Sequence, residues 1–305
     1  MKILITGGNG LIGSGLAVLL KNEGHEVVLM GRKRTYRANS EFKTLFWDIE
    51  NQELDIDAIK NTNAVIHLAG ENISDKRWTK KQKKIIEESR VKSAEFLFSQ
   101  FKKYGKMPEV YVSSSAIGYY GSFTSSVILS EDNPAGKDFL AGVCEKWEKS
   151  TQLFQNEGVR TVIIRTGVVL SPNGGAFIKL YNLVKNGLGS SLGNGKQYIP
   201  WIHIDDIVSI FYRALTQQNM SGVFNGVAPF NLTNSELIRI IAKKTGRRII
   251  LPAVPELLVR LIFGERSIIL LKGTRISPDK IISSGFKFKF PEPEKAIENL
   301  IEKLK

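Results

Sequence analysis

A glycine-rich turn near the start of the chain is the feature that most restricts what it can fold into. Residues 3–5 form a short apolar run before the turn, and residues 16–20 form an apolar, helix-like run after it. The turn carries glycines at three-residue spacing: Gly7, Gly10 and Gly13. The first glycine permits a tight turn, the second lets a pyrophosphate approach the backbone, and the third lets helix and strand pack closely. The sequence therefore predicts a dinucleotide-binding turn, with phosphates facing the free N–H groups of a helix N-terminus.

The residues around this turn define the expected cofactor contacts. We expect Asn9, Leu11 and Ile12 to line the phosphate site together with the glycines, because they occupy the same turn. In the Rossmann fold, an acidic residue after the second strand hydrogen-bonds the ribose 2′-hydroxyl of NAD. Arg32 and Lys33 stand at that place here, and a guanidinium can bind a 2′-phosphate through two parallel hydrogen bonds. The sequence thus predicts NADP over NAD; the alternative is that these cations are solvated surface residues.

Two further strand ends are expected to contact the cofactor. Asp48 ends the third predicted strand, where it either contacts the adenine amine or caps a turn. Leu68, Ala69 and Gly70 close the fourth predicted strand, and small residues at that point let the backbone approach a ligand. Ligands of open α/β sheets bind beyond the carboxyl ends of the strands, so we place these residues on the cofactor side.

The composition excludes several classes of protein. The chain has 305 residues, of which 42% are apolar and 24% charged, as in an ordinary globular protein. The single cysteine excludes an intrachain disulfide, and three widely spaced histidines indicate no metal site. The net charge of +13 comes from scattered lysines, densest at residues 80–84, so we expect neither a nucleic-acid nor a membrane partner. We expect a cytoplasmic protein, because residues 2–6 already form a core strand and leave no room for a signal peptide.

The order of the predicted elements indicates an α/β fold. Strands are expected at residues 2–6, 26–30, 44–47, 64–68, 109–113 and 161–169, with long helices at residues 79–103 and 140–156. Asp205 and Asp206 are expected to cap a helix that ends near residue 215, and a capping box at residues 233–236 to open a helix at residues 237–244. This alternation is typical of a parallel sheet covered on both faces. We assign residues 1–170 to a Rossmann doubly wound parallel sheet, to which strands near 201–204 and 222–225 return. Residues 171–200 and 230–305 are expected to form a smaller, mainly helical C-terminal substrate lobe.

These pieces together resemble the short-chain dehydrogenase/reductase superfamily, in its extended, nucleotide-sugar-epimerase-like branch. The matching segments are the glycine turn and residues 67–70, 113–121 and 201–206. Residues 70–78, 115–121 and 138–148 resemble a subgroup labelled "epimerase family protein" or "cell-division inhibitor", and residues 251–290 resemble its small C-terminal domain. The resemblance implies an NADP-dependent oxidoreductase or epimerase with a small-molecule substrate. It also implies a candidate homodimer, formed through the helices that flank the fourth and fifth strands.

The residue pair that moves the proton in that superfamily is missing. In the family, a Tyr-x-x-x-Lys pair lies one helical turn apart, and the lysine lowers the pKa of the tyrosine for proton transfer during hydride exchange. Alignment on Glu148 puts Leu140 at the tyrosine position and Cys144 at the lysine position. Neither side chain can do that work. Tyr181 and Lys185 have the right spacing but lie beyond the sixth predicted strand, so we treat them as a coincidence.

The remaining catalytic candidates follow the fifth predicted strand. By resemblance, Ser115 donates a hydrogen bond to a substrate oxygen, and Tyr119 or Tyr120 places a phenol near the nicotinamide. The alternative for Ser115 is a backbone hydrogen bond at the end of the strand. The alternative for the tyrosines is that one packs in the core while the other is exposed.

Four residues are candidates for substrate binding: Glu71, Arg77, Trp201 and His203. Glu71 and Arg77 follow the fourth predicted strand, and the alternative is that they form a surface ion pair. The other two lie in a segment that closes over the substrate in the extended branch, and a structural role for His203 is equally compatible. Arg165 stands within a strand pattern, where burial would require a partner.

Two functions remain open at this point. One is a catalytic NADP-dependent oxidoreductase or epimerase with a nonstandard acid/base, supported by Ser115, the paired tyrosines and a polar, glycine-rich loop at residues 187–200. The other is a non-catalytic NADP(H)-binding sensor or partner-binding protein, supported by the missing Tyr/Lys pair and the basic charge. Fold analogy does not choose between them.

The assignment of Arg32 gives a direct test of cofactor choice. In titrations that follow reduced-nicotinamide fluorescence, the protein is expected to bind NADPH tightly, and Arg32→Asp is expected to abolish that binding because it removes the phosphate clamp. Equal binding of NADPH and NADH by the unaltered protein would contradict the role of Arg32. Binding of neither would contradict the dinucleotide site itself.

Overall fold

The sheet that carries the predicted turn is formed in the order β11-β8-β6-β5-β1-β2-β3-β4. The computed structural model describes residues 1–32 and 41–304, and the strands are named within these ranges. Their bounds are β1 Lys2–Thr6, β2 Glu26–Gly31, β3 Lys43–Asp48, β4 Glu53–Leu54, β5 Ala64–His67, β6 Val110–Ala116, β8 Arg160–Thr166 and β11 Gly222–Gly226. All neighbours pair in parallel except β4, which runs antiparallel to β3. The doubly wound α/β fold predicted from the sequence is therefore confirmed.

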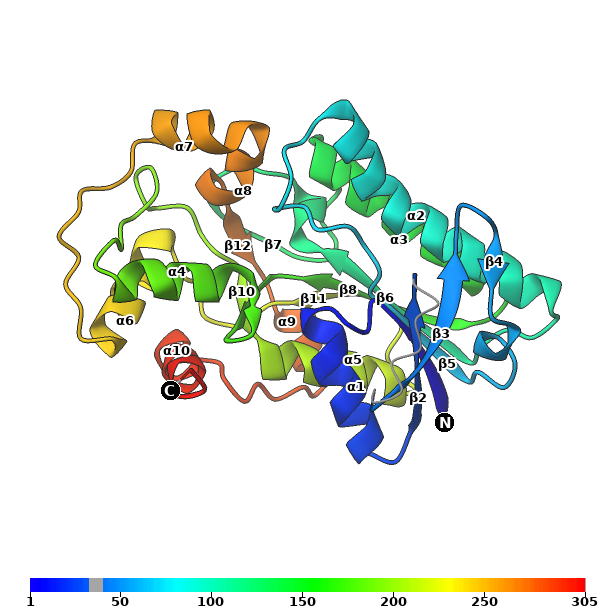
Figure 1. The fold of residues 1–305 in the computed structure, drawn as a ribbon. Coiled ribbons are helices and arrows are strands. Elements are labelled where there is room, and N and C mark those ends of the chain that lie inside the picture. Colours follow the sequence, from blue (N-terminus) through cyan, green and yellow to red (C-terminus); the bar gives the residue numbers. More distant parts are fainter. Residues whose placement is uncertain (33–40, 305) are drawn as a thin grey trace.

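Helices cover both faces of this sheet (Figure 1). α1 (Leu11–Asn22) and α5 (Ile204–Thr216) pack on one face, whereas α2 (Lys80–Lys103) and α3 (Phe139–Asn156) pack on the other. Successive strand residues point to opposite faces, so Ile3 and Ile5 of β1 enter the core under α1 and α5 while Leu4 enters the opposite core. This arrangement explains why the strands are apolar along their whole length.

The strand order reverses between β1 and β5. The chain proceeds from β1 outward to β2 and β3, and from β5 in the opposite direction to β6 and β8. A crevice opens at such a reversal because the two loops that leave the neighbouring strands diverge. The glycine turn after β1 and residues 68–70 after β5 both lie at this edge of the sheet.

The long helices agree with their predicted ranges to within a residue at each end. α2 begins after Thr79, whose side chain accepts the backbone N–H of Gln82, and α3 begins after Asp138, whose side chain accepts that of Ala141. The start of α5 differs from the prediction that Asp205 and Asp206 cap it. His203 is the N-cap residue, and the buried carboxylate of Asp206 accepts the N–H groups of Lys289 and Phe290 in the C-terminal segment.

The predicted strand at residues 161–169 is two strands in different sheets. β8 ends at Thr166, and β9 (Val168–Ser171) pairs in parallel with β10 (Trp201–His203) in a separate two-stranded sheet. The expectation that residues 201–204 return to the main sheet is therefore wrong, whereas β11 does return to it. The chain changes sheets at Gly167, where a Cβ would lie only 2.5 Å from the Pro200 carbonyl oxygen.

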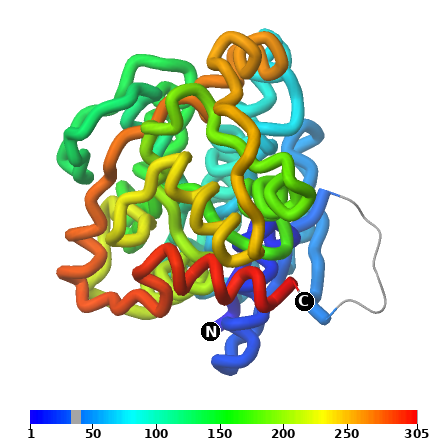
Figure 2. The backbone as a smooth tube through the Cα atoms, turned by 90° about the vertical axis from the view of Figure 1, so that its left-hand side faces the viewer, coloured from blue at the N-terminus to red at the C-terminus, as the bar shows by residue number. Residues whose placement is uncertain are grey.

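A second core lies under the C-terminal part of the chain. α4 (Gly175–Lys185), α6 (Asn234–Lys244) and α10 (Pro293–Glu302) meet around Trp201 and Tyr181. The predicted capping box opens α6, where the Thr233 side chain and the Glu236 carboxylate each accept the other's backbone N–H. Figure 2 shows α10 lying across the face turned toward the viewer, which is the side of the molecule away from β2 and β3 in Figure 1.

Two short strands that the sequence did not indicate join the two parts of the chain. β7 (Ser125–Leu129) follows β6, and β12 (Thr274–Ile276) lies between the short helices α8 (Ile268–Leu271) and α9 (Asp279–Ser283). They pair in parallel, with Arg275 opposite Ile128 and Ile276 opposite Leu129. Within the part of the chain that the structure describes, no helix combines the length and apolar character needed to cross a membrane.

The bend at Gly167 gives a stability prediction. Gly167→Ala is expected to lower the free energy of unfolding by about 1–3 kcal/mol, because the new methyl group would overlap the Pro200 carbonyl. Gly142→Ala is the matched control: Gly142 lies within α3, and its Cβ would meet nothing within 4 Å. We expect this control to gain about 0.5–1 kcal/mol from helix propensity. Urea denaturation measures the free energy of unfolding of both variants. Equal changes in the two variants would contradict the close approach of Gly167 to the Pro200 carbonyl.

Candidate functional site

The glycine turn forms a cradle at the N-terminus of α1. Gly7 has a φ of +69°, and a Cβ at this residue would lie 2.7 Å from the Leu68 carbonyl oxygen. A Cβ on Gly13 would lie 2.4 Å from the Gly7 carbonyl oxygen. Gly10 is the exposed N-cap of α1 and has no side chain that could cover the first N–H groups of the helix. The turn therefore approaches β5 at backbone distance and leaves a helix N-terminus open to an anion.

A chain of hydrogen bonds fixes the other wall of the crevice. Thr6 Oγ1 lies 2.8 Å from Nδ1 of the buried His67, and Ser93 Oγ lies 3.0 Å from its Nε2. The backbone N–H of Ala69 donates to Thr6 Oγ1 at 3.2 Å, and Ser93 Oγ donates to the Ser89 carbonyl. These donors and acceptors are all satisfied when His67 is neutral with its proton on Nε2. Burial lowers the pKa of His67 to about 4, in agreement with that form.

The residues expected at the adenosine end lie at the ends of β2 and β3. Arg32 is exposed directly after β2, and Lys33 lies outside the described residues. Lys76 donates to Glu71 at 3.0 Å and lowers the pKa of that carboxyl, and the charge of Arg32 adds a smaller effect in the same direction. Asp48 accepts the N–H groups of residues 50 and 51, as the turn-cap alternative requires, and its contact with an adenine stays a prediction.

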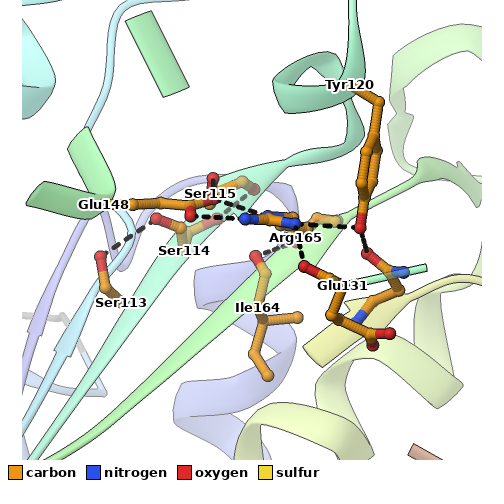
Figure 3. A network of polar contacts seen from close by, with 10 residues as sticks. Ser113, Ser114, Ser115, Tyr120, Glu131, Glu148, Ile164 and Arg165 are labelled. Atoms are coloured by element: carbon orange, nitrogen blue, oxygen red, sulfur yellow. Dashed lines mark hydrogen bonds and ion pairs between the residues drawn. The ribbon is translucent and has the colours of Figure 1, made fainter. Parts of the chain in front are cut away.

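A buried ionic network lies beyond the end of β6 (Figure 3). Arg165 of β8 binds Glu148 of α3 through two hydrogen bonds, from Nε to Oε1 at 2.8 Å and from Nη2 to Oε2 at 2.9 Å. The Arg165 side chain is 3% exposed and that of Glu148 is 11% exposed. Ser115 Oγ donates to the same carboxylate at 2.7 Å. Arg165 therefore has the buried partner that its position required, and the Ser115 hydroxyl is already engaged within the protein.

The two candidate tyrosines have different surroundings. Tyr120 is buried; its hydroxyl donates to Asn225 Oδ1 at 2.7 Å and accepts Arg165 Nη1 at 3.0 Å, and burial raises its pKa to about 12. Tyr119 is half-buried, and its ring lies over the Arg165 guanidinium at 3.4 Å from the ring centroid to Cζ. No group among residues 1–32 and 41–304 hydrogen-bonds the Tyr119 hydroxyl. Tyr119 thus keeps a phenol that a ligand can use.

The helix position that carries the family's lysine holds a neutral group. Cys144 of α3 is 4% exposed, and burial raises the pKa of its thiol to about 12. Leu140, one turn earlier, lies close to the backbone of Gly118. Tyr181 and Lys185 lie on α4, where Tyr181 packs in the second core. No Tyr-x-x-x-Lys pair therefore stands beside Ser115.

The substrate candidates fall into a buried and an exposed group. Trp201 is 1% exposed and donates from Nε1 to the Phe230 carbonyl, and His203 is 0% exposed and accepts the Asp205 N–H through Nδ1. These contacts favour the structural role over a substrate contact for both residues. Arg77 is exposed in the segment after β5, near the partly buried Glu71. Their substrate contacts stay predictions. Across the described residues, no three His, Cys, Asp or Glu side chains gather into a metal site.

The sequence did not identify four members of the polar networks. Ser93 was missed because nothing in its helix distinguishes it from a surface serine, and Asn225 because it lies in an ordinary strand. Glu131 was missed because its backbone carbonyl, which accepts from Arg165 at 3.4 Å, carries no residue signature. Glu148 served only as an alignment marker. The one available signal was Arg165, a cation within an apolar strand.

These features define a dinucleotide-binding α/β protein of the extended short-chain dehydrogenase/reductase type. Residues 3–225 match the NAD dependent epimerase/dehydratase family, and residues 254–300 match a domain of unknown function (DUF1731). The chain belongs to the NAD dependent epimerase/dehydratase family. The resemblance noted from the motifs, including the C-terminal domain, is confirmed.

Relatives match along nearly the whole chain. The human epimerase family protein SDR39U1 is 34% identical over 306 residues, covering 99% of this chain and 100% of that protein. The Mycobacterium tuberculosis epimerase family protein MT2273 is 37% identical over 287 residues, covering 94% of this chain and 93% of that protein. The crystal structure of human SDR39U1 with NADPH superposes with a TM-score of 0.90, covering 99% of each chain.

The buried ion pair gives a second stability prediction. Glu148→Gln is expected to destabilise the protein by about 3–5 kcal/mol, because it leaves the Arg165 guanidinium buried without its counter-charge. Glu87→Gln is the matched control, since it removes the partner of Lys146 at an exposed contact between α2 and α3. We expect the control to cost less than about 1 kcal/mol. Similar losses in urea denaturation would show that the Arg165 pair is not desolvated.

His67 gives a prediction on pH. Its folded-state pKa of about 4 lies below the ordinary value of 6.5, so the unfolded chain takes up a proton first as the pH falls. The stabilisation is fully present above pH 6.5 and is lost as the pH falls toward about 4, by up to about 3 kcal/mol. The difference in unfolding free energy between the unaltered protein and His67→Gln should shrink over this window. A constant difference would show that folding does not lower the pKa of His67.

Proposed function

We propose that the chain is a cytoplasmic NADP(H)-dependent oxidoreductase or epimerase that acts on a small-molecule substrate with Tyr119 in place of the missing proton-transferring tyrosine. The observation that carries this proposal is the Tyr119 phenol. It follows β6 at the cofactor edge of the sheet, it packs on the Arg165 guanidinium at 3.4 Å, and no described group binds its hydroxyl. The NADPH-bound crystal structure of the 34% identical human relative supports the choice of cofactor.

The crevice fits a dinucleotide by its own geometry. The Gly7–Gly13 approach leaves no space for side chains, and the open N-terminus of α1 suits a pyrophosphate. Arg32, at the end of β2, would hold a 2′-phosphate as a charge-assisted partner. Ala69 and Gly70 would lie along the nicotinamide ribose, on the segment that Thr6 and His67 fix. When bound, the nicotinamide supplies or accepts the hydride.

The network around Arg165 would support this chemistry by positioning. The pair with Glu148 holds the guanidinium in place, and the guanidinium in turn holds the Tyr119 ring. A phenol held beside a fixed cation can donate a proton to a substrate oxygen and keep the resulting negative charge close to a positive one. Ser115 would contribute by orienting Glu148 rather than by meeting the substrate directly.

A non-catalytic NADP(H) sensor is the second candidate. It is favoured by the engagement of Ser115 with Glu148, by the burial of Tyr120, and by the neutral Cys144 at the lysine position. In this case the cofactor would bind at the same crevice without being consumed. Both candidate functions therefore predict NADP(H) binding at the crevice, but only the catalytic one predicts that the cofactor is consumed.

Tyr119→Phe tests the catalytic proposal. A panel of carbonyl compounds and nucleotide sugars is screened for NADPH oxidation, and the variant is compared on any substrate found. We expect Tyr119→Phe to lower kcat/KM by about a hundredfold or more with NADPH affinity unchanged, because only proton transfer is lost.

Tyr120→Phe is the control for this experiment. It removes a hydroxyl that is buried against Asn225 and Arg165, so we expect lower stability with little change in the chemical step. Turnover that is unaffected by Tyr119→Phe would overturn the role of Tyr119. Tight NADPH binding without oxidation by any member of the panel would support the sensor.

A further inference from the structure

The helix α7 (Glu256–Phe263) presents apolar side chains to solvent instead of burying them. Its exposed residues form one surface, which we call the α7 patch, with exposed fractions of Leu257 76%, Leu258 46%, Leu261 75% and Ile262 59%. These positions lie on one side of the helix, whereas Val259 on the opposite side is 1% exposed. Glu256 and Arg260 pair with each other on the flank. The helix is therefore amphipathic, with its wider apolar face turned outward.

A strongly basic segment lies beside the α7 patch. Residues 76–84 contain six Lys and Arg side chains and no Asp or Glu. The start of α2 is joined to the segment after α7 by the ion pair between Lys83 and Glu265 at 2.6 Å, and by a hydrogen bond from Arg266 to the Ser74 carbonyl. Figures 1 and 2 both show α7 and the start of α2 at the same end of the molecule.

The lysines at the start of α2 oppose the local electrostatics of the helix. Lys80 and Lys81 are exposed in the first turn, which contains no acidic residue. Cations at a helix N-terminus face the positive end of the helix dipole and destabilise it slightly. Neighbouring carboxylates compensate part of this charge: Glu71 pairs with Lys76, Glu265 with Lys83 and Glu88 with Lys84. No such ion pair is made by Lys80 or Lys81 with any residue in the described ranges.

The positive charge of residues 76–84 indicates which kind of partner the α7 patch binds. A two-fold contact through the α7 patch would bring the basic segments of both copies near each other, and like charges across an interface oppose association. An anionic lipid surface meets both features, because it receives apolar side chains at the acyl boundary and attracts the surrounding cations. The same pattern of an apolar helix face with flanking Lys and Arg is typical of helices that lie in the membrane interface.

We propose that the α7 patch and the basic start of α2 together form a peripheral binding surface for anionic membranes. α7 lies parallel to the bilayer with Leu257 and Leu261 inserted, and Lys80 and Lys81 contact anionic headgroups. Binding is reversible and weakens with salt, because part of it is electrostatic. This inference differs from the expectation of no membrane partner, which rested on the scatter of the lysines along the sequence. It does not depend on the proposed catalytic function.

Vesicle co-sedimentation tests this surface. The full-length protein is expected to bind vesicles that contain phosphatidylglycerol more tightly than vesicles of pure phosphatidylcholine, with the difference removed by high salt. Leu257→Gln/Leu261→Gln is expected to weaken binding at least about tenfold, because the inserted apolar area is lost. Lys80→Glu/Lys81→Glu is also expected to weaken it at least about tenfold, since each cation near an anionic surface contributes roughly fivefold.

Matched variants control for the number of changes and for net charge. Val18→Gln/Tyr104→Gln replaces exposed apolar residues on α1 and at the end of α2, and Lys103→Glu/Lys106→Glu changes the same charge at the opposite end of α2. Both should bind vesicles as the unaltered protein does. NADPH affinity and circular dichroism confirm that every variant is folded. Equal binding of both vesicle types, or normal binding by the Leu257/Leu261 variant, would overturn the proposal. So would concentration-dependent self-association that this variant abolishes, because a second copy would then cover the patch.

Discussion

The buried pair between Arg165 and Glu148 is the interaction on which the cofactor edge of the protein depends. A guanidinium within a β-strand is tolerated in a sheet covered on both faces only when its charge and its donors are matched. Glu148 matches the charge, while the Tyr120 hydroxyl and the Glu131 carbonyl take a further N–H group. One side chain thereby connects β8, α3, the turn after β6 and the segment after β7.

This network also sets the polar contacts of Ser115. In the family pattern, Ser115 would work beside a tyrosine and a lysine on the neighbouring helix, but here that helix offers Leu140, Cys144 and Glu148. The serine hydroxyl turns to the carboxylate, and positive charge comes from β8 instead of from the helix. The cation that remains is held in one place and packs on the face of Tyr119. The proton transfer proposed for this chain therefore rests on Tyr119.

The crevice and the α7 patch differ in how closely the chain is packed. At the crevice, backbone segments approach within distances that exclude side chains, and neutral His67 joins them through satisfied hydrogen bonds. At α7, large apolar groups remain in water, although burying them would stabilise the isolated protein. The exposed α7 patch therefore does not give the lone folded chain its greatest stability. Both the crevice and the patch are typical of surfaces that meet another molecule.

Local patterns were sufficient for much of the fold. Apolar strand runs, the capping box at Thr233 and the glycine turn each act over a few residues, so the sequence located most strands of the main sheet, α6 and the cofactor cradle. The split between β8 and β9 was missed, although Arg165, Thr166 and Gly167 interrupt the apolar residues there and a glycine within a strand pattern can mark a bend. The pairing of β7 with β12 joins segments far apart in the chain, and nothing in either strand indicates the other.

The sequence by itself determined that a dinucleotide cradle stands at the start of an α/β sheet and that the usual tyrosine and lysine are absent. Only the tertiary structure decided which side chains surround Ser115, because the partners of Arg165 come from separate elements that meet through packing. It also decided that Trp201 and His203 are buried, that Tyr120 is engaged while the Tyr119 phenol remains available, and that α7 faces outward. Each of these outcomes depends on which face of a helix or strand is covered by the rest of the molecule. A local sequence pattern shows that an element has an apolar and a polar face, but it does not show which other element packs against either one.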